Sequence, residues 1–201
     1  MARLEFFFDC SSPWTWLGFE GVIPLAQRTG VTIEWRPFLV GGVFNTVNPS
    51  VYEGRANPVP VKQAYYEKDM ADWAARRGVV IGKPPVFPVN SVKAMRGAFL
   101  AIEAGNLVDY ARRVFRTYWT DLQDISQDAV MAGIAKASGF DPAEFLERIA
   151  QPDLKARLRA NTDELMARGG FGSPTMFVNG TDMYFGNDRL ELVEAALRRA
   201  A

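Results

Sequence analysis

The two ends of this chain carry strand patterns, whereas everything between them has the apolar spacing of helices. At the amino end, the apolar run 4–8 and the alternating run 31–36 indicate strands on either side of a helix that begins at Ser12 and is expected to stop at Gly30. At the carboxyl end, Asn179-Gly180 marks a two-residue hairpin between two strand patterns, and a helical period follows. The predicted order is therefore β-α-β, then helices, then β-β-α.

With the central helices removed, this order is that of a thioredoxin fold. The sequence therefore predicts an α/β protein, a thioredoxin-like fold with a large all-helical insertion between its β-α-β and β-β-α halves. We expect residues 1–60 and 169–201 to form the thioredoxin-like domain and residues 61–168 to form the helical insertion subdomain. A chain of 201 residues suits one domain with an inserted subdomain.

The connecting segments give further expectations. Residues 37–60 contain Gly-Gly, Asn-Pro and other turn signals, which predict a long irregular connection. A helix is expected from residue 61 to Gly78, and Ser91 is expected to cap the next helix. The residues expected to share the buried face of the first of these helices are Val61, Tyr65, Trp73 and Ala74. Later helices are expected at 107–118, 127–138 and 142–168, the last broken near Pro152.

Composition excludes several kinds of site. The chain has no histidine, so a Ser-His-Asp triad, a Cys-His dyad and histidine-based metal sites are excluded. Its one cysteine, Cys10, rules out an intrachain disulfide and a cysteine-rich zinc site. Lys+Arg and Asp+Glu both total 23, which gives no indication of nucleic-acid binding, so the expected partner is small. No segment has the length of a signal-peptide core or a membrane span, so a cytoplasmic location without membrane association is expected.

Ser12 is the first candidate for chemistry. A Ser-Pro pair at a helix start is ordinarily a cap, and that simple interpretation stays open. The same position, directly after a first strand, lies in the positive field of a helix N-terminus, which favours a thiolate. Thioredoxin-like proteins place the first cysteine of Cys-x-x-Cys here, whereas this chain reads Ser-Pro-Trp-Thr at residues 12–15. Disulfide exchange by this motif is impossible, but a serine can still donate a hydrogen bond to the thiolate of a ligand.

Three other positions are candidates. Ser173-Pro174 is either a plain turn or a cis proline whose neighbouring backbone pairs with an extended peptide-like ligand. Asp188 is expected to cap the last helix, and the same helix start can hold an anionic or zwitterionic group. Cys10, at the end of the first strand, is interpreted as a buried structural thiol rather than a nucleophile.

These motifs resemble a known family. Residues 8–17, Phe-Asp-Cys-Ser-Ser-Pro-Trp-Thr-Trp-Leu, resemble the Asp-x-x-Ser-Pro-aromatic-x-aromatic-Leu signature of 2-hydroxychromene-2-carboxylate isomerases. These are relatives of kappa-class glutathione transferases among the DsbA-like thioredoxin folds. Residues 170–178 and 184–190 are similar to the ending of that family, so the resemblance spans nearly the whole chain. Positions that fit its inserted helix are Lys62, Tyr65, Asp69 and Trp73.

The resemblance implies that glutathione is the cofactor. It implies that the hydroxyl of Ser12 hydrogen-bonds the glutathione sulfur and favours its thiolate. It further implies that the peptide backbone of glutathione pairs with Ser173 beside Pro174. The residues that the resemblance assigns to the two ends of glutathione are Asn187 and Asp188 for the γ-glutamyl group, and Lys62 with Asn57 for the glycine carboxylate.

The resemblance also implies a reaction of aromatic catabolism. The thiolate adds to the conjugated carbon of trans-o-hydroxybenzylidenepyruvate, the former double bond rotates, and the phenol oxygen closes onto the ketone. Expulsion of the thiolate gives 2-hydroxychromene-2-carboxylate. The implied partners are a small aromatic substrate, glutathione and a second copy in a homodimer. Two alternatives stay open, a kappa-like transferase and a non-catalytic thioredoxin-fold binding module. A DsbA-type oxidoreductase is disfavoured because the motif lacks both cysteines.

Overall fold

The protein is built on a four-stranded mixed sheet. In the computed structural model, which describes residues 2–200, the strands are β1 (Leu4–Phe8), β2 (Ile33–Pro37), β3 (Thr175–Val178) and β4 (Asp182–Phe185). Their order is β2-β1-β3-β4, with β1 parallel to β2 and antiparallel to β3, and β3 antiparallel to β4. The predicted thioredoxin-like arrangement of the two ends of the chain is therefore confirmed.

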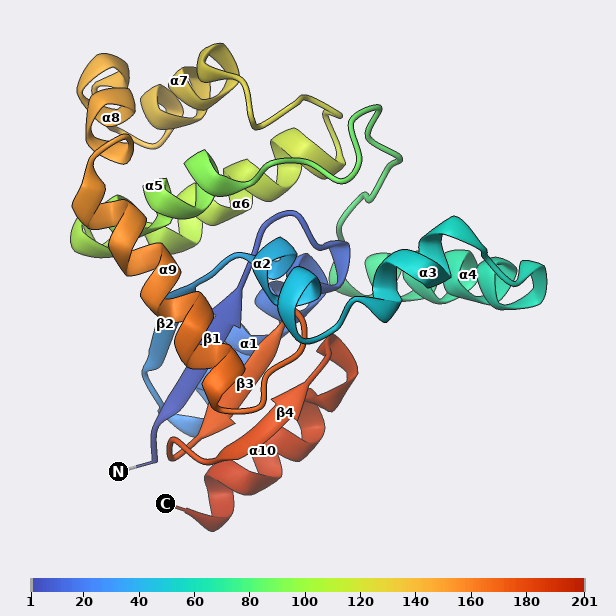
Figure 1. Ribbon diagram of the computed structural model, residues 1–201. Coiled ribbons are helices and arrows are strands. Elements are labelled where there is room, and N and C mark those ends of the chain that lie inside the picture. The colour runs from blue at the N-terminus through green and yellow to red at the C-terminus, as the bar shows by residue number, and fades with distance from the viewer. Residues whose placement is uncertain (1, 201) are drawn as a thin grey trace.

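Helices cover both faces of the sheet (Figure 1). The helices on one face are α1 (Pro13–Thr29) and α10 (Leu190–Arg199), the latter preceded by the 3-10 turn η1 (Asn187–Arg189). The helices on the other face are α2 (Val40–Thr46) and α9 (Pro152–Ala167). The alternation of side chains along β1 explains both layers, because Phe6 and Phe8 pack against Phe19 of α1 whereas Phe7 packs against Phe177 and Phe38.

The remaining helices form a body above the sheet and an arm beside it (Figure 1). The helices of the body are α5 (Val92–Glu103), α6 (Leu107–Trp119), α7 (Asp128–Ala137) and α8 (Pro142–Ile149). The helices of the arm are α3 (Ser50–Ala56) and α4 (Pro60–Arg77). One continuous cluster of buried residues joins the α1 face of the sheet to the helical body. The division into a domain of residues 1–60 and 169–201 and a subdomain of residues 61–168 stays a prediction.

Helix α1 begins and ends where the sequence indicates. Ser12 is its N-cap, and the Ser12 hydroxyl accepts a hydrogen bond from the amide nitrogen of Thr15 at 3.3 Å. Gly30 follows the helix with φ of 69°, a left-handed conformation that favours glycine. This helix therefore presents Ser12 at the edge where β1 ends.

Three expectations about the connections are wrong. Residues 37–60 are not irregular, because α2 and α3 occupy most of the segment. The first half of α4 has no buried face, since Val61 is 77% exposed and Tyr65 is 65% exposed, whereas Ala74 is buried. The Ser91 hydroxyl does not cap α5. The amide nitrogen of Val92 instead donates to the Asn90 side chain at 3.0 Å.

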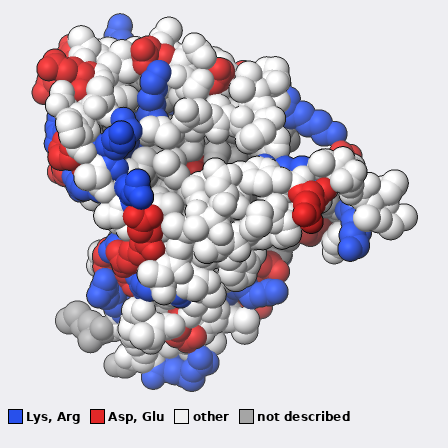
Figure 2. Space-filling model, viewed as in Figure 1, with Lys and Arg blue, Asp and Glu red and all other residues white. Residues whose placement is uncertain are grey.

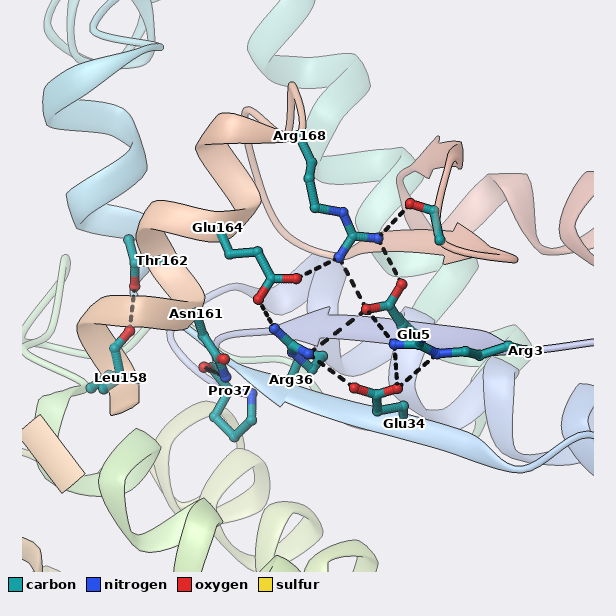
Figure 3. A network of polar contacts seen from close by, with 11 residues as sticks. Arg3, Glu5, Glu34, Arg36, Pro37, Leu158, Asn161, Thr162, Glu164 and Arg168 are labelled. Atoms are coloured by element: carbon teal, nitrogen blue, oxygen red, sulfur yellow. Dashed lines mark hydrogen bonds and ion pairs between the residues drawn. The ribbon is translucent and has the colours of Figure 1, made fainter. Parts of the chain in front are cut away.

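A network of charged side chains ties α9 to the sheet (Figure 3). Its centre is Glu5, which is 1% exposed and accepts hydrogen bonds from Arg168 at 3.0 and 2.6 Å. Arg3 and Arg36 lie 3.3 and 3.8 Å from the same carboxylate. Burial acts to raise the pKa of Glu5, but the hydrogen bond and charge of Arg168, with the charges of Arg3 and Arg36, lower it overall. The buried carboxylate is therefore held ionised.

Within residues 2–200, no helix is both long and apolar enough to cross a membrane. The same residues contain no group of three or more acidic or cysteine side chains placed to hold a metal ion.

Candidate functional site

Ser12 lies half-buried at the N-terminus of α1, next to the loop that precedes β3. Its hydroxyl donates to the carbonyl oxygen of Ser173 at 3.4 Å, a long hydrogen bond. The same hydroxyl accepts from Thr15, so it lies among the free amide groups at the helix start. A sulfur anion placed beside Ser12 would meet a hydroxyl donor and the positive end of the helix together.

The Ser173-Pro174 peptide bond is cis, as the functional interpretation of this loop predicts. The Ser173 side chain is buried, and its hydroxyl lies 2.6 Å from the hydroxyl of Thr15 and accepts from the amide nitrogen of Asp9 at 3.2 Å. Pro174 lies so close to α1 that a Cβ at Gly18 would be 2.8 Å from the proline ring, so glycine is required there. The side chain of Ser173 thus faces the interior, and its carbonyl faces Ser12.

Asp9 is a site residue to which the sequence interpretation assigned no role. It is 1% exposed, and its carboxylate accepts hydrogen bonds from the amides of Ser11 and Val40 at 2.9 Å each and from the Ser91 hydroxyl at 3.0 Å. Burial raises the pKa of Asp9, although these hydrogen bonds act in the opposite direction. Asp9 therefore joins the Ser12 loop to α2 and α5. The available signal was a carboxylate directly after a wholly apolar strand, where burial requires partners.

Cys10 is a structural residue, as expected. Its side chain is 1% exposed, and burial together with the nearby charge of Asp9 raises the pKa of its thiol well above the ordinary value. Its carbonyl oxygen accepts a hydrogen bond from the indole nitrogen of Trp119 at 3.0 Å. This bond anchors the loop before Ser12 to α6, and the Trp119 side chain itself is buried.

Asn187 and Asp188 lie in η1, which packs against α1. Asn187 is 4% exposed, and its amide nitrogen has no hydrogen-bond partner in the part of the chain that the structure describes. Asp188 does not cap a helix, which corrects that expectation. Its carboxylate instead accepts from the side chain of Arg189 at 2.8 Å. Asn187 therefore has a buried donor with unused capacity, and Asp188 has a carboxylate at the surface.

Asn57 and Lys62 lie on the arm, and both side chains are exposed. The arm approaches Ser12 through Trp14 and Tyr66, whose ring centroids are 5.3 Å apart. Lys62 precedes Tyr66 by about one turn of α4. The structure therefore brings Ser12, Ser173 and Pro174 together directly, and the roles of Asn57 and Lys62 stay predictions.

An aromatic cluster lies beyond Cys10, toward the arm. The Phe87 ring is 6.0 Å from the Trp119 ring, and the Arg55 guanidinium lies 5.0 Å from Phe87 and 5.6 Å from Phe44. Phe87 is 48% exposed. Between the arm and the helical body, this face of the molecule is mostly free of charged side chains (Figure 2). Such a surface can receive a planar apolar molecule.

Comparison with known proteins gives consistent matches over nearly the whole chain. The family profile of the DSBA-like thioredoxin domain matches residues 3–198. The 2-hydroxychromene-2-carboxylate isomerase of Pseudomonas putida is 28% identical, over 98% of this chain and 94% of that protein. Glutathione S-transferase kappa 1 of Homo sapiens is also 28% identical, over 94% of this chain and 88% of that protein. A solved structure of 2-hydroxychromene-2-carboxylate isomerase superposes with a TM-score of 0.81 at 26% identity, covering 98% of this chain and 95% of the other.

Proposed function

The chain belongs to the DsbA-like thioredoxin domain family, and from this premise we propose that it is a glutathione-dependent enzyme in which Ser12 replaces a redox cysteine. The observation that carries the proposal is the position of the Ser12 hydroxyl, at the N-terminus of α1 and 3.4 Å from the Ser173 carbonyl. A long hydrogen bond of this kind is readily exchanged for a stronger one to a thiolate. At residue 12 the chain keeps the position where a thioredoxin-like fold stabilises a sulfur anion, but it has a serine there instead of a cysteine.

The remaining residues of the site fit a peptide with charged ends. The backbone of Ser173, held by Thr15 and Asp9, would pair with the main chain of glutathione. Asn187 and Asp188 would hold the γ-glutamyl group, because one offers an unpartnered amide donor and the other a carboxylate for the ammonium. The residues proposed for the glycine carboxylate are Lys62 and Asn57.

We propose the isomerisation of 2-hydroxychromene-2-carboxylate and trans-o-hydroxybenzylidenepyruvate as the reaction. When bound, glutathione supplies a thiolate that adds to the conjugated carbon and later leaves. Ser12 would hold the sulfur as an anion, and a lower thiol pKa raises the thiolate fraction at neutral pH. The exposed ring of Phe87, which packs on Trp119, would orient the aromatic substrate against it, so that both reactants meet in a fixed geometry. No step requires a histidine.

A kappa-like transferase is the second candidate, because the human kappa-class relative is as similar to this chain as the Pseudomonas isomerase, at 28% identity each. The two activities share the proposed glutathione residues and differ in the fate of the sulfur. In the transferase the carbon–sulfur bond persists and glutathione is consumed.

Product analysis separates the candidates. Purified protein is incubated with 2-hydroxychromene-2-carboxylate, with and without reduced glutathione, and both compounds are quantified by chromatography with mass detection. Interconversion that requires glutathione but does not consume it supports the isomerase. Loss of glutathione into a conjugate equal in amount to the lost substrate supports the transferase. If protein that binds glutathione catalyses neither isomerisation nor conjugation, both enzyme proposals are contradicted and the non-catalytic binding module remains.

We also propose a homodimer in which the arm packs against a second copy. The apolar side chains Val59, Val61 and Tyr65 are 49, 77 and 65% exposed on the arm, which is unusual for a surface without a partner. Light scattering after size exclusion tests this. A mass of twice 22.4 kDa that falls to 22.4 kDa in a Val61→Glu, Tyr65→Glu variant supports the dimer, and a monomeric wild type contradicts it.

A further inference from the structure

A cavity of about 230 Å³ lies where α1, α4 and η1 with α10 meet. Its lining includes Gly21 and Arg28 of α1, Arg76 and Arg77 at the end of α4, and Asn187. Gly21 is nine residues after Ser12 along the helix, which places this cavity roughly 13 Å from the Ser12 end of α1. It shares Asn187 and Asp188 with the proposed glutathione site but extends away from Ser12.

The cavity has an excess of unpaired positive charge. Arg28 is paired with Glu194 at 2.7 Å, and Asp188 is paired with Arg189, so these charges are already balanced. Arg76 and Arg77 form no ion pair within residues 2–200, and both guanidinium groups lie over the ring of Trp73. Glu191 is the remaining carboxylate of the lining. Burial and the charges of Arg76 and Arg28 lower the pKa of Arg77.

Two hydrogen-bond donors in the lining have no acceptor. The Nε of Arg77 and the Nδ2 of Asn187 are both buried without a hydrogen-bond partner among the described residues. Buried donors are rarely left unsatisfied in folded proteins, so two of them on residues that line one cavity indicate a missing acceptor. Gly21 leaves room for the guanidinium, because a Cβ there would lie 2.6 Å from Nη2 of Arg77.

We propose that this cavity is an oxyanion subsite, in which Arg77 and the amide of Asn187 bind a carboxylate or phosphate group. A planar guanidinium and an amide donor together match the oxygens of such a group. The oxyanion is either a free anion or the α-carboxylate at the γ-glutamyl end of a bound peptide. The subsite itself does not depend on the proposed enzyme activity.

The test is calorimetric titration of inorganic phosphate, in chloride buffer at constant ionic strength, into wild-type protein and Arg77→Gln. The matched control is Arg116→Gln, which removes an exposed arginine of α6 outside the cavity. We expect saturable binding that weakens at least tenfold in Arg77→Gln and is unchanged in Arg116→Gln. Absence of saturable phosphate binding by the wild type, or equal affinity in both variants, would overturn the proposal.

Asn187→Leu provides a second variant with a different readout. Because the amide nitrogen of Asn187 has no partner, its removal is expected to leave the melting temperature in phosphate-free buffer unchanged or higher, while phosphate affinity falls at least fivefold. A lower melting temperature with unchanged phosphate affinity would give Asn187 a purely structural role and overturn its assignment.

A competition experiment distinguishes the two sources of the oxyanion. If reduced glutathione displaces phosphate, the oxyanion belongs to the peptide. If both bind together, the cavity takes a free anion. Phosphate binding that depends on Arg77, in protein that binds no glutathione, would support the subsite while contradicting the proposed function.

Discussion

The hydroxyl of Ser173 lies 2.6 Å from the hydroxyl of Thr15, so the two segments of the candidate site are joined from the inside. Thr15 belongs to the first turn of α1, and Ser173 precedes Pro174, which lies directly before β3. The contact directs the Ser173 side chain inward, and its carbonyl remains toward Ser12. The backbone proposed to pair with glutathione is thus positioned by a buried hydrogen bond.

Thr15→Val tests this contact. Valine keeps the shape of threonine but leaves the buried Ser173 hydroxyl without this partner, so the free energy of unfolding should fall by about 1–2 kcal/mol. The matched control is Thr46→Val. In the wild type, the hydroxyl of Thr46 donates a hydrogen bond to the Gly42 carbonyl on an exposed turn of α2. Urea unfolding measures both. Equal stability of the two variants would show that the Thr15–Ser173 contact does not support the loop.

Asp9→Ala should have a larger effect. The substitution leaves the amides of Ser11 and Val40 and the hydroxyl of Ser91 without their acceptor, which predicts a loss of about 3 kcal/mol. Asp9→Asn retains the shape and one acceptor oxygen, so it should lose less. An Asp9→Ala variant as stable as the wild type in urea would contradict the role given to this carboxylate.

The pH dependence of Asp9 and Glu5 should run in opposite directions. Burial raises the pKa of Asp9 in the folded protein. The contribution of Asp9 to the free energy of unfolding is therefore present below its unfolded pKa of about 3.9 and is lost as the pH rises through the folded pKa. Asp9→Asn should remove that loss. The measurement is the free energy of unfolding from pH 3 to 7. A variant whose pH profile runs parallel to that of the wild type would contradict a raised pKa.

The pKa of Glu5 is lowered overall in the folded protein. The contribution of Glu5 to the free energy of unfolding is therefore present above its unfolded pKa of about 4.3 and is lost as the pH falls through the folded pKa. Arg168→Gln should therefore destabilise the protein by about 1–2 kcal/mol at pH 7 and by less at pH 3. This loss of unfolding free energy is smaller than for a fully buried ion pair. Arg168 is partly exposed, and Arg3 and Arg36 still lie beside Glu5 in the variant. Arg159→Gln, which removes an exposed pair on α9, is the control. An equal loss at both pH values would contradict the ion-pair account.

Cys10 should resist thiol reagents. Its thiol is buried and its pKa is raised, so modification by a chromogenic disulfide at pH 8 should be at least a hundredfold slower in native protein than in denaturant. A Ser50→Cys variant, with an added thiol at the exposed start of α3, provides the reactive control. Native modification of Cys10 at the rate seen in denaturant would contradict its structural role.

Local signals in the sequence predict the two ends of the fold well. Ser12 and Gly30 mark the limits of α1, and Asn179-Gly180 forms the turn between β3 and β4. Each of these signals acts within a few residues, so no knowledge of the rest of the chain is needed.

The errors arise where distant residues decide the structure. Helix α2 contains Gly41-Gly42, which argues against a helix, but its first amide, that of Val40, donates to Asp9. Its side chains Val40 and Val43 are buried against α9 and the sheet. The apolar spacing of Val61 and Tyr65 predicts a buried face, yet no element within residues 2–200 covers that part of α4. The inward orientation of Ser173 depends on hydrogen bonds with Thr15 and Asp9, which are distant in the sequence, so the sequence alone could not predict it.

The central claim is that Ser12 lowers the pKa of a bound glutathione thiol. The most direct measurement is the ultraviolet absorbance of thiolate in the glutathione complex from pH 5 to 10, in wild type, Ser12→Ala and the control Ser126→Ala, at a serine with no proposed role in the site. The account predicts a bound-thiol pKa at least one unit below that of free glutathione in wild type and Ser126→Ala, and a return toward the free value in Ser12→Ala. Equal pKa values in wild type and Ser12→Ala would contradict the account, and Ser12 would then be only the cap of α1.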